Sequence, residues 1–343
     1  MTDRIGVTLA SLMTQPPMTW RGTATMADEL GYDSIWTAET TGPEAFSLLG
    51  SLGTQFPRLS LGTGVLALQL RTPQVVAMGA ATLAALNPDI DVLVGVGISS
   101  PVVVGRWHGA DYGPRPLAQV REFLTLVRQC LSGEVVNFDG DFYSARKFRL
   151  SINSPTTPGS DRGPKLVLGA LNTKMLHLAG ELADGVLLNY LPASAVRWCV
   201  EQVRAGELAA GREPGSCTVH AYVHVGVTNP EAARIPGQRD LFSYIVVDSY
   251  AKAFARAGFE AEVQAVREAH AAGDRDAALA AVSDEMIGAI DICGDADHVR
   301  DAVDAYRRSG VDNPVIMPLP WSLDRSMNRQ RIVHDTLRAS IGH

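Results

Sequence analysis

The chain has 343 residues, of which 46% are hydrophobic and 20% are charged, and its formal net charge is −7. One hydrophobic core can serve a chain of that length when the fold is a barrel of parallel strands. The mildly acidic balance, without any run of basic residues, gives no electrostatic reason to bind nucleic acid or an anionic membrane.

The first apolar run, Ile5–Ala10, is too short and too polar for a signal peptide. No later stretch reaches the roughly 18 uninterrupted apolar residues that a membrane-spanning helix needs. We therefore predict a cytoplasmic protein. The four cysteines, Cys130, Cys199, Cys217 and Cys293, are scattered, and no pair has the C-x-x-C spacing. We expect them to be buried free thiols.

Short apolar runs alternate along the chain with longer amphipathic segments, as repeated βα units require. Most of these runs are continuous, which is typical of parallel strands buried on both faces. The predicted strands are Ile5–Ala10, Ser34–Ala38, Leu59–Leu66, Asp91–Val96, Lys165–Gly169, Gly185–Asn189, Thr218–Val227 and Asn313–Met317. A predicted helix such as Trp20–Leu30 ends at a glycine, here Gly31. The pattern predicts a single (β/α)8 TIM barrel over residues 1–343, with its working site at the C-terminal ends of the strands.

Two regions are longer than a βα unit needs, and we predict that they are insertions on the C-terminal face of the barrel. Residues 97–163 contain a predicted helix, a hairpin and an exposed loop, which are Leu117–Leu131, Val135–Tyr143 and Ser151–Gly163. Residues 229–285 are helical by their period, with breaks at Gly258 and Gly273. The aromatic residues of this second insertion have helical spacing and are predicted to be core residues: Tyr244, Tyr250, Phe254 and Phe259.

A doubly wound open sheet is the architectural alternative. A dinucleotide-binding fold has G-x-G-x-x-G after its first strand. Here Ser11–Gln15 follows the first strand and has no glycine, and the nearest match, Gly95–Ser100, lacks the third glycine. These absences exclude a nicotinamide site of that kind.

Polar residues and glycines at two strand tips are candidates for a site. The second strand leads into Glu39 and Thr40. A carboxylate there could orient a cofactor or accept a proton, and the alternative is a salt bridge or a helix cap. The third strand contains Gly62 and Gly64, which indicate either a bulge that lies close to something flat or tight packing within the barrel.

The fifth strand is followed by a predicted helix that begins near Asn172 and Thr173, either of which is a good N-cap. The exposed amides of the first turn, with Lys174 beside them, can bind an anion. A plain helix cap is the alternative.

Two histidines lie on the seventh predicted strand, at His220 and His224. Alternation places both on one face, but four residues of strand separate them by about 13 Å, too far to share one metal ion. No H-E-x-x-H motif occurs, so no metal site is predicted. His224, nearer the C-terminal end, is the one that could reach the pocket, although a hydrogen-bonded barrel histidine is the favoured alternative.

Taken together, these motifs resemble the luciferase-like flavin/deazaflavin oxidoreductase family, and more closely its coenzyme F420-dependent branch. The matching segments occur in the family's order over nearly the whole chain. They are Ala27–Trp36 leading to Glu39, Leu61–Leu66, Gly95–Pro101, Arg106–Gly109, Asn137–Tyr143 and Leu178–Val186.

The resemblance implies a (β/α)8 barrel, often a homodimer, that binds F420. The deazaflavin ring would lie over the tip of the third strand, at a bulge with a non-proline cis peptide that matches Gly64–Val65. Glu39 matches an acidic residue that contacts the ring. The other implied cofactor contacts are Ser99 and Ser100 beside the ring, and Leu171, Asn172, Lys174 and Met175 at the phosphate-bearing tail.

Three departures from the family pattern are visible. Sugar-phosphate dehydrogenases of the family carry a catalytic histidine where this chain has Thr40, and a glutamate where it has Ser100. Both differences argue against sugar-phosphate oxidation. The segment Asn87–Asp91 also lacks the glycine and arginine usual before the fourth strand.

The favoured hypothesis is an F420-dependent oxidoreductase that moves a hydride between the deazaflavin and a small-molecule substrate, with Glu39 and Thr40 nearest in sequence to the proton chemistry. One alternative is an FMN-dependent luciferase-like monooxygenase. Another is a catalytically silent cofactor-binding barrel.

Overall fold

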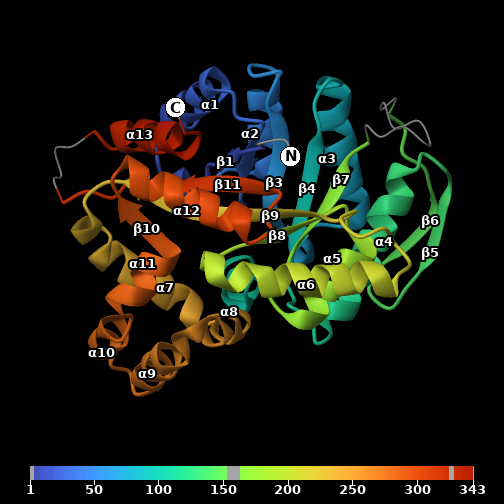
Figure 1. Ribbon diagram of the computed structural model, residues 1–343. Coiled ribbons are helices and arrows are strands. Elements are labelled where there is room, and N and C mark those ends of the chain that lie inside the picture. Colours follow the sequence, from blue (N-terminus) through green and yellow to red (C-terminus); the bar gives the residue numbers. More distant parts are fainter. Residues whose placement is uncertain (1–3, 153–162, 324–327, 343) are drawn as a thin grey trace.

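The computed structural model describes residues 4–152, 163–323 and 328–342. Its centre is a closed ring of parallel strands, in which the last strand pairs with the first (Figure 1). The ring consists, in order, of β1 (Gly6–Thr8), β2 (Ser34–Thr37), β3 (Ser60–Ala67), β4 (Val92–Gly97), β7 (Lys165–Gly169), β8 (Gly185–Leu188), β9 (Thr218–Val227) and β11 (Asn313–Pro318). The predicted TIM barrel is therefore confirmed.

Helices surround the ring because each strand buries a second face against them. They are α1 (Pro17–Leu30), α2 (Ala45–Gly53), α3 (Pro73–Leu86), α4 (Pro116–Leu131), α5 (Thr173–Leu182), α6 (Ala193–Ala209), α12 (Ala296–Arg308) and α13 (Arg329–Ser340). As predicted, α1 stops at Gly31, which has a φ of 80°. None of the helices in the described ranges is long and apolar enough to cross a membrane.

The barrel interior is filled by side chains from most of the strands. They form one cluster of Trp36, Leu93, Val167, Leu187, Tyr222, Val315 and Met317. A larger apolar layer lies between strands and helices and includes three of the four cysteines. All four cysteines are buried and free, as predicted. Burial raises the pKa of the Cys199 thiol to about 11, so this thiol stays protonated at neutral pH.

The first insertion contains the predicted hairpin, formed by β5 (Val136–Asp139) and β6 (Ser144–Phe148). The predicted range Val135–Tyr143 covers the first strand and the turn, whereas the second strand begins only at Ser144, beyond that range. The carboxylate of Glu122 on α4 accepts the backbone N–H groups of Asp141, Phe142 and Tyr143, which fixes the turn against that helix. Most of the predicted loop Ser151–Gly163 lies outside the described residues.

The second insertion is helical, as predicted, and its helices gather at one end of the molecule in Figure 1. They are α7 (Arg234–Ile245), α8 (Asp248–Phe254), a π-helical turn (Ala255–Phe259), α9 (Glu260–Ala271), α10 (Arg275–Ala280) and α11 (Asp284–Ile290). Gly258 and Gly273 break the series with φ values of 106° and 78°. The aromatic residues predicted as core belong to a separate apolar cluster within this insertion.

One strand was not predicted. The strand β10 (Asp291–Gly294) follows α11 and pairs in parallel with the C-terminal half of β9, from His224 to Val227. The N-terminal half of β9 pairs instead with β8. This extra strand therefore extends the barrel wall beyond the end of β8 and brings Asp291 beside His224.

Candidate active site

The tip of β3 is bulged, as predicted. Its register against β4 shifts between Thr63 and Leu66, and the peptide bond between Gly64 and Val65 is cis. The Tyr222 hydroxyl, on the opposite strand β9, donates to the Gly64 carbonyl at 3.0 Å. This contact ties the bulge to the far wall of the barrel.

The two glycines of β3 are explained by packing within the barrel. A Cβ on Gly64 would lie 2.0 Å from the Tyr222 hydroxyl oxygen, and one on Gly62 would lie 2.2 Å from the Trp36 indole. Tight packing within the barrel, one of the two explanations that the sequence left open, therefore accounts for the missing side chain at Gly64. Val65, the next residue of the bulge, is partly exposed.

The tip of β4 lies beside this bulge. A Cβ on Gly95 would lie 1.9 Å from the Thr63 carbonyl oxygen, and one on Gly97 would lie 2.8 Å from Val65. The glycine pair that partly resembled a dinucleotide motif thus makes room for the bulge. Beyond it, Ser99 has a φ of 50°, and the Ser100 hydroxyl accepts the N–H of Val103 in the next helical turn.

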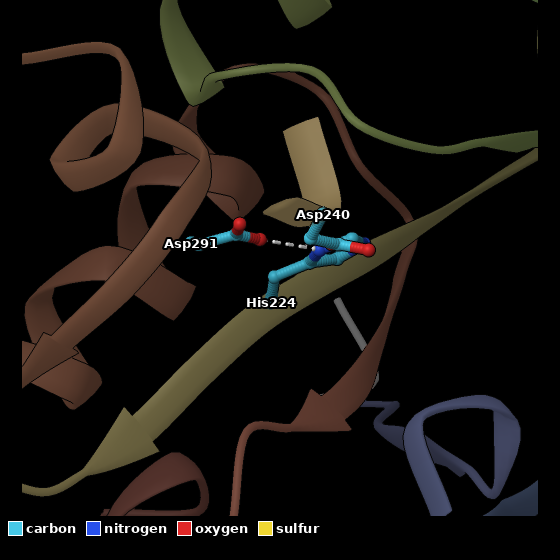
Figure 2. A group of neighbouring side chains, drawn as sticks. All are labelled: His224, Asp240 and Asp291. Carbon is cyan, nitrogen blue, oxygen red and sulfur yellow. Dashed lines mark hydrogen bonds and ion pairs between the residues drawn. The ribbon is translucent and has the colours of Figure 1, made fainter. Parts of the chain in front are cut away.

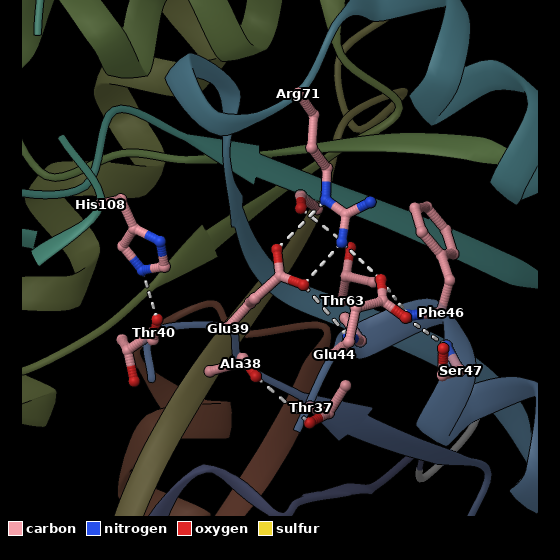
Figure 3. A network of polar contacts seen from close by, with 12 residues as sticks. Thr37, Ala38, Glu39, Thr40, Glu44, Phe46, Ser47, Thr63, Arg71 and His108 are labelled. Atoms are coloured by element: carbon pink, nitrogen blue, oxygen red, sulfur yellow. Dashed lines mark hydrogen bonds and ion pairs between the residues drawn. The ribbon is translucent and has the colours of Figure 1, made fainter. Parts of the chain in front are cut away.

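Glu39, just after β2, is held by an arginine that the sequence did not single out. Arg71 donates to both of its carboxylate oxygens, from Nη2 at 2.6 Å and from Nε at 3.2 Å (Figure 3). The same guanidinium also pairs with Glu44, and these hydrogen bonds raise the pKa of Arg71. Both Glu39 and Arg71 are mostly buried, so the pair fixes the carboxylate in place.

Thr40, the next residue, is fixed through its backbone. Its carbonyl accepts a hydrogen bond of 2.6 Å from Nε2 of His108, which lies beyond β4 (Figure 3). In the sequence, His108 stands out only as part of the segment Arg106–Gly109. The hydrogen bond from His108 to the Thr40 carbonyl connects the tips of β2 and β4.

The start of α5 departs from the prediction in one respect. Asn172 occupies the N-cap position, but its side chain does not cap the helix. Instead its Nδ2 donates to the Ser249 carbonyl at 3.0 Å, and its Oδ1 accepts from Arg256 at 3.3 Å. Arg256 also donates to the Leu171 carbonyl at 2.6 Å and stacks on the Trp198 ring. The second insertion thus places a cation beside this helix start, and burial lowers the pKa of Arg256.

Thr173 and Lys174, in the first turn of α5, are exposed, and Met175 is partly buried. The predicted contacts for a cofactor tail are therefore accessible on the surface of the described chain. They lie after β7, whereas Gly64 and Val65 lie on β3 and Ser99 and Ser100 follow β4. All three strands are neighbours in the ring, so the predicted site residues share one side of the barrel mouth.

The two histidines of β9 have different surroundings. His220 is buried near Trp36, and its Nδ1 lies 3.0 Å from Nδ2 of Asn313. Burial lowers the pKa of His220 to about 3, so this imidazole is neutral. His220 is thus a hydrogen-bonded histidine of the barrel interior. His220 takes part in none of the contacts described next for His224.

His224 belongs to a buried polar cluster that sequence analysis missed. Its Nδ1 lies 2.9 Å from Asp291 Oδ1, and its Nε2 lies 2.8 Å from Asn189 Oδ1. Asp240, on α7, completes the cluster (Figure 2). Burial, and secondarily the charge of Asp291, raises the pKa of Asp240 to about 7. No local motif signals this group, since its members come from β9, α7 and β10.

A cavity of about 290 Å³ opens at the other end of the barrel, at the N-terminal ends of the strands. Its lining pairs opposite charges, as in the 2.9 Å contact between Lys165 and Asp91. In this fold the N-terminal face contributes to stability and the C-terminal face carries the chemistry. We therefore place the candidate site at the strand tips described above.

Comparison with known proteins identifies the family. A sequence model described as luciferase-like monooxygenase matches residues 6–313. The chain belongs to this luciferase-like family. The family prediction made from the sequence motifs is thus confirmed.

Similar proteins cover nearly the whole chain. A Mycobacterium tuberculosis protein named for coenzyme F420-dependent oxidoreductase activity is 30% identical over 336 residues, which cover 91% of this chain and 94% of that protein. The 5,10-methylenetetrahydromethanopterin reductase of Methanolobus tindarius is 28% identical and covers 84% of this chain and 86% of its own.

Solved structures share the fold. The coenzyme F420-dependent tetrahydromethanopterin reductase of Methanopyrus kandleri superposes with a TM-score of 0.80 at 21% identity, covering 100% of this chain and 99% of that one. An F420-dependent secondary alcohol dehydrogenase superposes with a TM-score of 0.74 at 19% identity, covering 99% of each chain.

Proposed function

We propose that this chain is a coenzyme F420-dependent oxidoreductase that transfers a hydride between the deazaflavin and a small organic substrate. The observation that carries the proposal is the similarity over 91% of the chain to a relative named for F420-dependent oxidoreductase activity. The methanopterin reductase relative adds support, because its similarity also extends over most of both chains. The substrate itself is not specified by these similarities.

The start of α5 fits the phosphate-bearing tail of F420. Helix N-termini attract anions, and the side chain of Asn172 leaves this one uncapped. Arg256 and the exposed Lys174 add positive charge beside it. Leu171, Asn172, Lys174 and Met175 would hold the tail.

The ring would lie on the bulge, between the backbone of Gly64 and Val65 and the turn that contains Ser99 and Ser100. Bound F420 would supply or accept a hydride at C5 of its deazaflavin. The task of this chain is then to hold the ring and substrate in contact and to keep water out. Glu39 is fixed by Arg71 and so offers a rigid carboxylate near the ring.

A binding titration tests this assignment. Purified protein is titrated with F420 and with FMN while the intrinsic tryptophan fluorescence is followed. We expect saturable quenching by F420 and much weaker quenching by FMN. Glu39→Ala should weaken F420 binding about tenfold, which corresponds to the loss of roughly 1.4 kcal/mol of contact. Unchanged affinity in that variant would remove Glu39 from the site, and tighter binding of FMN would contradict the cofactor assignment.

A second titration tests the tail contacts. Arg256→Gln should weaken F420 binding several-fold but leave unchanged the binding of a deazaflavin riboside that has no phosphate tail. Phosphate contacts weaken with salt, so the difference should shrink as ionic strength rises. Equal losses for both ligands would indicate that Arg256 acts on the fold of the insertion and not on the tail.

Two other functions remain as candidates. An FMN-dependent monooxygenase is favoured only by the wider family, whose model is described as luciferase-like monooxygenase. A catalytically silent barrel is suggested by Thr40, which stands where sugar-phosphate dehydrogenases have a histidine. Hydride transfer from reduced F420 to any member of a panel of carbonyl compounds would exclude the silent barrel.

A homodimer and a location in the cytoplasm are further proposals. Light scattering coupled to gel filtration would test the first, and fractionation of the source cells the second.

A further inference from the structure

We propose that His224, Asp240 and Asp291 form a binding site for one divalent transition-metal ion, such as Zn²⁺ or Mn²⁺, at the mouth of the barrel. This proposal goes beyond the F420 assignment and does not depend on it. It also replaces the expectation from sequence that the chain holds no metal.

The three residues come from separate elements that meet only in the folded chain: β9, α7 and β10 (Figure 2). Each offers one ligand atom, and these atoms all lie within 4.8 Å of one another. The shortest separation, from His224 Nδ1 to Asp291 Oδ1, is 2.9 Å. Nitrogen and oxygen ligands bind a transition metal at about 2.0–2.2 Å, so two ligands of one ion lie at most about 4.4 Å apart. The pair 2.9 Å apart fits around one ion, and any pair near the 4.8 Å limit would have to move closer by a few tenths of an ångström on binding.

The orientation of His224 is set by its other nitrogen. Asn189 Oδ1 accepts the backbone N–H of Tyr190 at 3.0 Å, which fixes this amide oxygen as an acceptor. It therefore accepts a hydrogen bond from Nε2 of His224, at 2.8 Å. With the proton on Nε2, the lone pair of a neutral imidazole lies on Nδ1 and faces Asp291. Metal-binding histidines are held in this way, by donating their second N–H to an oxygen.

The charge of the cluster also points to a cation. Asp291 is fully buried, and its Oδ2 has no hydrogen-bond partner in the described part of the chain. Among the ion pairs of the described residues, neither Asp240 nor Asp291 has a lysine or arginine partner. Buried carboxylates require a compensating charge, and a single imidazole offers at most one. A divalent ion would balance both.

The location gives the ion access to solvent and to the barrel mouth. Asp240 is only partly buried, and the Tyr190 hydroxyl donates to its Oδ2 at 2.9 Å, which holds this carboxylate in place. His224 lies two residues beyond Tyr222 on the same face of β9, about 6.6 Å further toward the mouth. Because Tyr222 touches Gly64, the ion would lie on the wall that faces the bulge of β3.

The test uses the full chain without an affinity tag, freed of metal by a chelator, and ZnCl₂ or MnCl₂ alone as titrant. Calorimetry should give one ion per wild-type chain, and bound ion should raise the melting temperature. His224→Gln, Asp240→Asn and Asp291→Asn should each weaken binding at least tenfold. Asn189→Ala, which removes only the supporting acceptor, should weaken it by a smaller factor.

A matched control is available on the same strand. His220→Gln changes a buried histidine with a neutral partner, and it should leave the stoichiometry and affinity unchanged. Circular dichroism establishes whether each variant is folded. If the fully buried Asp291→Asn variant does not fold, Asp240→Asn still tests the proposal, because Asp240 is only partly buried. The proposal is overturned if the wild-type chain takes up no stoichiometric Zn²⁺ or Mn²⁺, or if Asp240→Asn binds as the wild type does. A shared proton would then account for the short contact between His224 and Asp291. No F420 is present, so the outcome is independent of the cofactor assignment.

Discussion

The two walls of the barrel mouth balance their charges in different ways. Beside β2 and β3, the carboxylates of Glu39 and Glu44 share the guanidinium of Arg71. Beside β9 and β10, the imidazole of His224 contacts the carboxylate of Asp291, and an oxygen of the Asp240 carboxylate lies within 4.8 Å of both. An arginine is charged at every accessible pH, whereas an imidazole carries a charge only when protonated.

This difference separates a permanent structural pair from a site with room for a ligand. The first wall needs no further ion to hold its carboxylates in position, which suits the proposed role of Glu39 as a rigid contact for the deazaflavin. The second wall keeps a buried carboxylate oxygen, Oδ2 of Asp291, that has no hydrogen-bond partner among the described residues. A buried acceptor without a partner is costly, and such groups concentrate at functional sites.

The largest effect is expected where the two walls touch. Gly64→Ala would place a methyl group 2.0 Å from the Tyr222 hydroxyl oxygen, in a barrel interior that is already full. We expect the free energy of unfolding to fall by about 3 kcal/mol, the upper part of the range for overpacked cores. Urea denaturation measures it.

The control for this substitution is Gly288→Ala. Gly288 lies inside α11, and no atom lies within 4 Å of its added Cβ. Alanine there should be neutral or stabilise the helix by up to about 1 kcal/mol. Equal stability of the Gly64→Ala variant and the wild type would show that β3 and β9 can move apart. The two walls would then not be rigidly joined through Gly64 and Tyr222.

The glycines of β3 also show how far the sequence could predict this site. Two glycines in an apolar run predict a bulge because no other residue fits so closely against a neighbour. Which neighbour occupies the space is a tertiary fact, and Tyr222 lies 158 positions away. The barrel could be predicted because the signal is local. Most of the strands are continuous apolar runs, and such a run by itself indicates a strand that is buried on both faces.

The second wall could not be predicted in this way. Asp291 begins a strand of four residues that follows α11 directly, too short and too polar at its start to be recognised as a strand. Its partner His224 lies 67 positions away, and no spacing rule connects them. Arg71 was missed similarly, because it follows β3 while its partner Glu39 follows β2.

A smaller effect, about 2 kcal/mol, is expected from acid on the same strand as His224 but at the opposite end of the barrel, where His220 lines the N-terminal cavity. His220 has a pKa of about 3 in the folded chain because it is buried, against 6.5 when unfolded. Between these values the unfolded chain binds the extra proton, so stability falls as the pH falls. Between pH 7 and pH 5 this histidine should remove about 2 kcal/mol from the free energy of unfolding. His220→Asn should lose that part of the pH dependence, which urea denaturation at several pH values measures. Identical slopes for the two proteins would mean that His220 accepts a proton without unfolding.

The smallest effect is expected on the first wall. Arg71→Gln leaves Glu39 and Glu44 facing each other without their cation, and we expect a loss of about 1 kcal/mol, since Glu44 is exposed enough to be screened by water. Arg71→Lys keeps the charge but cannot donate to both oxygens of Glu39, so it separates charge from geometry. If charge alone matters, the lysine variant should match the wild type in stability and in F420 affinity. If the rigid placement of Glu39 matters, the lysine variant should keep its stability but bind F420 as weakly as the glutamine variant. The second result is expected here, because Arg71 donates to both oxygens of a mostly buried carboxylate.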